Sequence, residues 1–215
     1  MLGLNWSTLL TALPGVLVAM TFHEYAHGWV AWKLGDPTAA RAGRLSPEPW
    51  RHIDWWGFFA LLILGFGWAK PVPIDPRYFR RPRRDMALVG LAGPLSNFVM
   101  AAGAALILAV WQKVAPTTLV GFGYDVFQIL AALFVLNVAF GVFNLIPVPP
   151  LDGSRGLAAL LPGRLAWWFY QLDRWGLVFL VALLLIPGFL TGVLEPVRHA
   201  VAMAIYNMAN QLVNG

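Results

Sequence analysis

Long apolar stretches alternate with short polar segments along this chain and predict helices that cross a membrane. A helix needs about 20 apolar residues to span the hydrocarbon core of a bilayer. Three stretches meet that length, at residues 6–33, 86–111 and 126–146. The sequence of 166–213 predicts further helices, with a fourth span at 167–186. The final part, 190–213, is apolar but contains charged residues, and it either spans the membrane or lies at its interface. The pattern predicts an all-α polytopic protein with about four to five transmembrane helices.

The segment between the first two predicted spans, residues 36–73, has a different character. Its first half is polar and rich in turn-forming residues, which predicts turns and short strands. Residues 55–68 are apolar but too short for a span, and glycines interrupt them, so they predict a re-entrant or interfacial segment. Irregular backbone at membrane depth is tolerated only where protein or a wet cavity covers it. This segment is therefore a candidate cavity wall.

The composition agrees with a membrane protein. Hydrophobic side chains make up 59% of the chain and charged ones only 12%, whereas an average soluble domain has about 25% charged residues. These values exclude an ordinary soluble enzyme, a disordered chain and a soluble nucleic-acid binder. We expect one membrane-embedded domain over residues 1–215. Because cysteine is absent, any metal ion must be held by His, Asp or Glu.

The basic residues predict how the chain is oriented. They concentrate in the loops at 33–85 and 147–165, whereas the loop between the second and third spans holds only Lys113. Cytoplasmic loops carry an excess of lysine and arginine. We therefore expect a multi-pass protein of the cell membrane with an external N-terminus and both basic loops in the cytoplasm.

The first predicted span carries an unusual polar motif, His23-Glu24-Tyr25-Ala26-His27. Residues four apart project from one face of a helix, so the two imidazoles can share one zinc ion. Glu24 lies about 100° around the helix, within reach of a water on that ion. Ionisable residues inside a span are costly unless they are paired or bind a metal. A polar cluster that joins helices is the alternative.

A catalytic zinc site needs a third protein ligand and an open position for water. Asp152 is the leading candidate, because it follows a proline-rich break after the third span. His23 lies about 15 Å from the cytoplasmic end of its helix, and Asp152 follows the span that ends on that same side. Taken alone, Asp152 reads more readily as a turn or capping residue. Glu195 remains a rival ligand.

Two further polar residues have simpler interpretations. Small residues surround Asn97, which favours close helix packing at this position, with polar support of the site as the alternative. His52 lies in the polar segment and is expected at the surface or at an interface.

Five motifs together resemble the site-2 proteases, a family of intramembrane zinc metalloproteases. They lie at 23–27, 35–45, 67–73, 92–97 and 144–153. The resemblance implies a three-helix catalytic core with one zinc ion per chain on His23, His27 and Asp152. It also implies that Glu24 serves as general base and acid. The chain looks like a compact member without an inserted PDZ or CBS domain.

The same resemblance assigns residues to the substrate. It places Asn144 in the active site, where this asparagine helps to hold the substrate. It also implies a re-entrant segment between the first two core helices. We assign Gly67 and Lys70 of that segment to substrate binding as well.

The predicted function is hydrolysis of peptide bonds within or near transmembrane segments. The partners are then a transmembrane substrate, for example a membrane-tethered regulator, and the lipid bilayer, with no nucleic acid; self-association is compatible with these features. The alternative is a non-catalytic metal-binding membrane protein or a zinc transporter. A transporter needs polar residues towards both faces, and the outer halves of these spans are almost bare.

Overall fold

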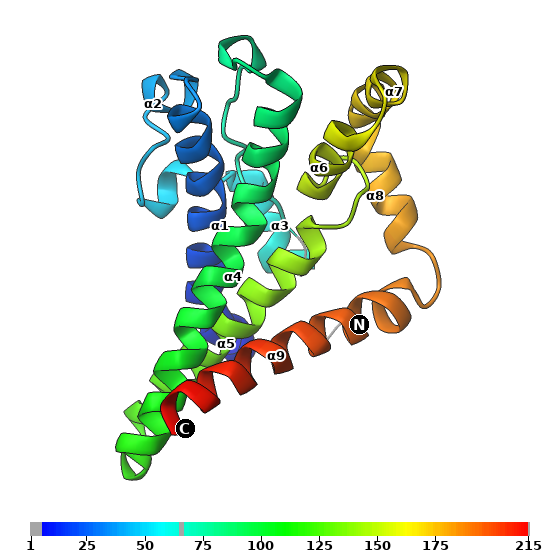
Figure 1. The fold of residues 1–215 in the computed structure, drawn as a ribbon. Coiled ribbons are helices and arrows are strands. Elements are labelled where there is room, and N and C mark those ends of the chain that lie inside the picture. Colours follow the sequence, from blue (N-terminus) through cyan, green and yellow to red (C-terminus); the bar gives the residue numbers. More distant parts are fainter. Residues whose placement is uncertain (1–5, 65–66, 215) are drawn as a thin grey trace.

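Three long helices, α1, α4 and α5, pack against one another at the centre of the structure (Figure 1). The computed structural model describes residues 6–64 and 67–214. Between these limits the elements are α1 (Trp6–Lys33), α2 (Thr38–Arg41), η1 (Pro49–Arg51), α3 (Trp55–Leu64), η2 (Pro76–Tyr78), α4 (Pro82–Val114), η3 (Pro116–Thr118), α5 (Phe122–Asn144), α6 (Asp152–Leu160), α7 (Gly163–Asp173), α8 (Gly176–Leu184), η4 (Phe189–Leu194) and α9 (Glu195–Asn214). The described part is helical, as the sequence predicts.

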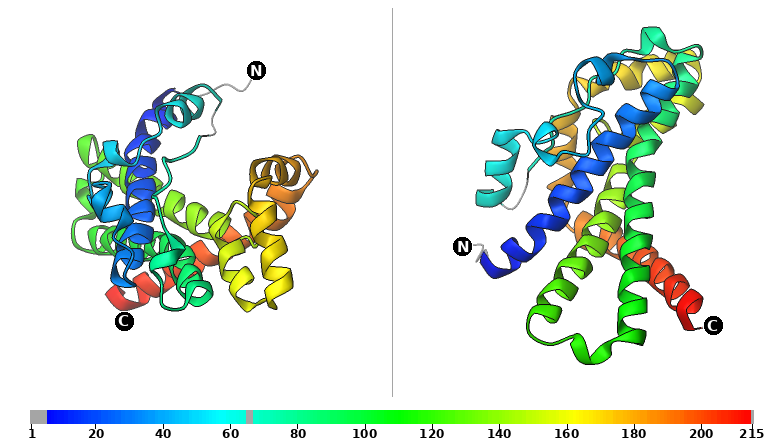
Figure 2. Two further views of the ribbon diagram at one scale, coloured as in Figure 1. Left: turned by 90° about the horizontal axis from the view of Figure 1, so that it is seen from above. Right: turned by 90° about the vertical axis from the view of Figure 1, so that its left-hand side faces the viewer.

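Helices α4 and α5 run antiparallel and are joined by η3 at one end of the molecule (Figure 2). Over the described residues they are the two helices that are long and apolar enough to cross a membrane. Helix α1, the predicted first span, has 28 residues and contains the polar motif. The larger number of spans expected from the sequence stays a prediction.

Small side chains let the central helices approach closely. Ala101, Ala105 and Val138 are buried where α4, α5 and α9 meet. Helix α9 lies diagonally across α4 and α5 (Figure 1). Because lipid tails are as apolar as these side chains, close van der Waals packing holds such helices together.

The predicted span at 167–186 is divided in the structure. Helix α7 ends at Asp173, and α8 begins at Gly176 after a short turn, so neither helix is long enough to cross a bilayer alone. A methyl group on Gly176 would come within 2.8 Å of the ring nitrogen of Pro150. The glycine therefore allows a close approach to the proline-rich turn, while the charged residues before it interrupt the apolar run.

The 36–73 segment also differs from the prediction of short strands. Helix α3 occupies most of its apolar part, and an isolated antiparallel bridge joins Ile53 to Ala69; the described portion of the segment contains no regular strand. Its turns are stabilised by buried side chains instead. The Asp36 carboxylate is fully buried and accepts hydrogen bonds from the amides of Thr38 at 2.9 Å and Asp75 at 2.7 Å.

Arg44 and His52 order the end of this segment. The buried Arg44 guanidinium donates to the carbonyl oxygens of Lys70 at 2.6 Å and Pro71 at 3.2 Å. The His52 ring donates from Nε2 to the carbonyl of Ser46 at 2.7 Å, and its main-chain carbonyl accepts from Lys70. His52 is only 1% exposed, so the expected surface position was wrong. The ring is instead buried within the segment, where it binds the main chain at Ser46.

The burial of His52 predicts a pH-dependent stability. Burial lowers the pKa of the His52 imidazole below its ordinary value of 6.5, and its Nδ1 has no hydrogen-bond partner. The unfolded chain then binds this proton more readily than the folded one, so stability falls as the pH drops below 6.5. We expect thermal unfolding in detergent at pH 7.5, 6.0 and 5.0 to show a steeper loss for the wild type than for His52→Gln, which can still donate to Ser46. Parallel curves would contradict this.

Candidate metal centre

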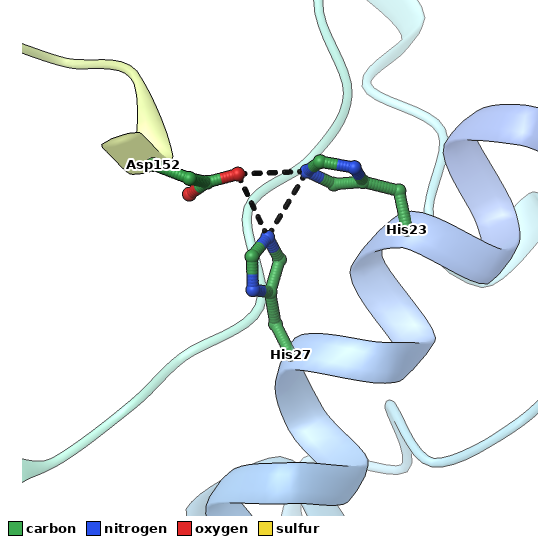
Figure 3. Close-up of side chains that lie close together, drawn as sticks. All are labelled: His23, His27 and Asp152. Carbon is green, nitrogen blue, oxygen red and sulfur yellow. Dashed lines mark hydrogen bonds and ion pairs between the residues drawn. The ribbon is translucent and has the colours of Figure 1, made fainter. Parts of the chain in front are cut away.

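Three potential metal ligands converge between α1 and the start of α6 (Figure 3). The Oδ2 atom of Asp152 lies 3.0 Å from Nε2 of His23 and 3.1 Å from Nε2 of His27. The two Nε2 atoms are 3.0 Å apart. All three side chains are buried, with residue exposures of 7%, 4% and 7% for His23, His27 and Asp152. The structure thus brings together the three residues that the motifs single out.

Local sequence explains this convergence. His23 and His27 lie one turn apart on α1 and project from one face. Asp152 is the first residue of α6, which follows the proline-rich turn and packs against α4. A Cβ on Gly153 would come within 2.2 Å of the carbonyl oxygen of Leu145. The glycine after Asp152 therefore permits the tight reversal that places the carboxylate over α1.

Both imidazoles are held from behind through Nδ1. His27 Nδ1 donates to the main-chain carbonyl of Val89 at 2.7 Å, and His23 Nδ1 lies 2.7 Å from the side-chain oxygen of Asn97. Both partners belong to α4. Such contacts behind a metal ligand orient the ring and select the nitrogen that faces the ion.

The donor set fits a zinc ion. Because His27 uses Nδ1 as a donor to a carbonyl, its neutral ring presents a lone pair on Nε2. That lone pair faces the carboxylate of Asp152 and Nε2 of His23, and such electron-rich atoms need a cation among them. Two imidazole nitrogens and one carboxylate oxygen within 4.8 Å match a catalytic zinc site, in which water takes the fourth position.

Glu24 lies next to this group without joining it. The ligand cluster found among the described residues comprises His23, His27 and Asp152 alone. The Glu24 Oε2 atom accepts a hydrogen bond from the main-chain amide of Val72 at 3.0 Å. The 67–73 segment therefore orients this carboxylate, which remains outside the ligand set and is compatible with the predicted role of a base.

The position of Glu195 decides whether it is a rival metal ligand. It lies at the start of α9, where its exposed carboxylate pairs with Arg198. It has no place in the His and Asp cluster.

The three predicted substrate residues lie outside the metal cluster. Asn144 is half-buried at the end of α5, and its amide donates to the carbonyl of Phe140 at 3.1 Å. Gly67 packs closely against Gly57 of α3, and the Lys70 side chain is exposed. Their contacts with substrate stay predictions.

An apolar pocket of about 730 Å³ lies beside the three-helix core. Side chains of α1, α3 and α5 line it together with Gly67 and Trp68, and the charged residues Asp54, Glu195 and Arg198 also contribute. It brings the 67–68 backbone and helix α3 onto one surface with α1, which carries the histidines.

Two residues of α4 and one of α5 shape the centre without having been predicted as its main residues. Asn97 was expected mainly to pack, yet it contacts His23 directly. Gly93 lies one turn before Asn97, and a Cβ there would come within 2.4 Å of His27 Nε2 and 2.6 Å of His23 Nε2. Asn137 of α5 is fully buried and bonded to Asn97. The available signal was the presence of asparagines inside apolar spans, which are costly unless they have a role.

Comparisons with known proteins agree with this geometry. A family model described as peptidase family M50 matches residues 122–186. YwhC of Bacillus subtilis, which is named a zinc metalloprotease, is 36% identical over 172 residues, covering 80% of this chain and 78% of YwhC. Rip2 of Mycobacterium tuberculosis, with the same kind of name, is 30% identical over 211 residues, covering 89% of this chain and 76% of Rip2. No solved structure matches significantly.

The chain therefore belongs to peptidase family M50, the family of the site-2 proteases. This confirms the resemblance drawn from the motifs and the predicted class of enzyme, a zinc metalloprotease.

The close contact at Gly93 predicts that Gly93→Ala displaces both imidazoles. Changes to residues behind metal ligands typically lower metal affinity about 10- to 100-fold. We expect Gly93→Ala to lower zinc affinity by at least that much. Gly103→Ala is the matched control, because it lies on the same helix with no atom within 4 Å of its added methyl group. Zinc competition with a chelator measures both variants. Equal zinc affinity in the two variants would show that the space at Gly93 on α4 does not determine how the imidazoles bind zinc.

Proposed function

We propose that this M50 peptidase hydrolyses peptide bonds within or next to the transmembrane segments of membrane-protein substrates. The observation that carries this proposal is a buried His, His and Asp cluster with a carboxylate beside it. The helices that hold it pack against α4, which like α5 is long and apolar enough to cross a membrane. Such a site gives a substrate bond at membrane depth both a metal and a base.

His23, His27 and Asp152 would hold the zinc ion, one per chain. When bound, zinc polarises a peptide carbonyl and makes water a better nucleophile at neutral pH. Glu24 then receives the proton that the attacking water loses and transfers it to the leaving amine nitrogen. The Val72 amide holds Oε2 of Glu24, so the carboxylate starts from a defined orientation.

The substrate must unwind before it is cut, because a helix hides its carbonyls in its own hydrogen bonds. An extended stretch of substrate could pair with irregular backbone of the 67–73 segment, as a strand added to an exposed edge. Arg44, His52 and Glu24 already order that backbone. We assign Asn144, Gly67 and Lys70 to this substrate path, and the apolar pocket to the neighbouring side chains of the substrate.

The centre is proposed to face the cytoplasmic side of a cell membrane that the chain crosses four to five times, as expected from the sequence. Arg83, in the first turn of α4, donates to the carbonyl oxygens of Ala159 and Leu161, which links the start of α4 to the end of α6. Lys113 lies at the opposite end of α4, next to η3. The two arginine-rich loops therefore share one end of the molecule.

The proposed base predicts the behaviour of Glu24→Gln. We expect purified protein in detergent to cleave single-span membrane peptides, and Glu24→Gln to lower that rate about 100- to 10,000-fold, because it can no longer accept a proton. Zinc content should stay at one per chain, since Glu24 is outside the ligand set. Glu48→Gln, which alters an exposed acid paired with Arg51, is the control. Equal cleavage by both variants would contradict the assignment.

The proposed substrate path predicts a separate effect of Arg44→Ala. Hydrogen bonds from charged donors contribute about 1.5–3 kcal/mol, so loss of those to Lys70 and Pro71 should lower kcat/KM about 10- to 100-fold. Zinc affinity should not change. Arg41→Ala serves as control, since its exposed guanidinium donates to the Tyr78 hydroxyl and to no other side chain in the part of the chain that the structure describes. Full activity of a stably folded Arg44→Ala would remove the 67–73 segment from the substrate path.

A further inference from the structure

We propose that Asn137 is a positioning residue of the metal centre, which acts through Asn97 to fix the tautomer of His23. The inference rests on the proposed metal site and adds a residue of α5 that does not touch the ligands. Asn97 and Asn137 are both fully buried, on α4 and α5. They form a continuous hydrogen-bonded path from α5 through α4 to the histidine on α1.

The path begins at a main-chain carbonyl. The Asn137 amide nitrogen lies 2.8 Å from the carbonyl oxygen of Leu133, one turn earlier on α5. A carbonyl oxygen only accepts hydrogen bonds, so the Asn137 side chain must present its nitrogen to Leu133. Its side-chain oxygen then points to Asn97, whose Nδ2 lies 2.9 Å away.

A second carbonyl fixes Asn97 in the same sense. Its Nδ2 also donates to the main-chain oxygen of Ala19 on α1 at 3.1 Å. Both amide hydrogens of Asn97 are therefore used, one on Ala19 and one on Asn137. With the amide turned over, its oxygen would face two acceptors. The side-chain oxygen of Asn97 must then be the atom that faces His23.

This orientation decides which nitrogen of His23 carries hydrogen. Since Asn97 presents an acceptor at 2.7 Å, His23 donates from Nδ1 and keeps the lone pair of its neutral ring on Nε2. That atom points to Asp152 and His27. His27 obtains the same tautomer from a main-chain carbonyl, which no side-chain change removes. His23 depends on two side chains, and Asn137 is the more remote of them.

The test measures Zn²⁺ affinity of the full chain in detergent by chelator competition. Asn97→Leu should weaken binding about 10- to 100-fold, the usual cost of removing a partner behind a ligand. Asn137→Leu should weaken it as well, by no more than Asn97→Leu. The double variant should bind Zn²⁺ as Asn97→Leu does, because Asn137 acts only through Asn97. Asn137→Ala accompanies Asn137→Leu in case the larger side chain does not fit.

A control and a spectrum separate positioning from general damage. Val138→Ala truncates a neighbouring, fully buried residue of α5 and should lower thermal stability without changing Zn²⁺ affinity. The visible bands of the Co²⁺-loaded protein should shift in the Asn137 variants and not in Val138→Ala.

Two results would overturn the inference: unchanged Zn²⁺ affinity in a folded Asn137 variant, or additive losses in the double variant. If the wild type itself bound no zinc, or if Glu24→Gln cleaved normally, the proposed function would fail instead.

Discussion

Every polar group placed among apolar helices must find a partner in the protein, and the architecture around the metal centre follows from that constraint. His23 and His27 need an acceptor behind each ring, and α4 supplies a side-chain oxygen from Asn97 and a main-chain oxygen from Val89. Asn97 in turn needs acceptors for both of its amide hydrogens. Residues of α1, α4 and α5 together thus pair all these groups.

The polar main-chain groups of the 36–73 segment also need partners in the protein, and they find them in a different way. Its backbone does not form a regular sheet in the described residues, so its carbonyls and amides are paired by buried side chains. Arg44 takes two carbonyls, Asp36 takes two amides and Glu24 takes one. One consequence is mechanistic. The carboxylate proposed as base also holds the segment proposed to meet the substrate, so substrate placement and base orientation are coupled through Val72.

The sequence was sufficient for the long central helices and for the pair of histidines on one helix face, because these depend on residue type and on short spacing. The convergence of Asp152 with this pair depends on contacts across 125 or more residues of chain. A histidine pair four residues apart projects from one helix face in any fold. It was insufficient where contacts between distant segments decide the outcome. The burial of His52, the split between α7 and α8 at Gly176, and the bond between Asn97 and Asn137 all depend on which elements meet. No local pattern contains that information.

The register of α1 against α4 shows how few residues fix the centre. On α4, residues 89, 93 and 97 follow one another at four-residue spacing along one face, and on α1 residues 27, 23 and 19 do so in the opposite direction. Val89 accepts from His27, Gly93 leaves room for both imidazoles, and Asn97 bridges His23 and the Ala19 carbonyl. A shift of one residue would turn all three positions by about 100°. The metal site can therefore form only when α1 and α4 pair in the correct register. Once they do, the contacts behind both imidazoles are in place before an ion binds.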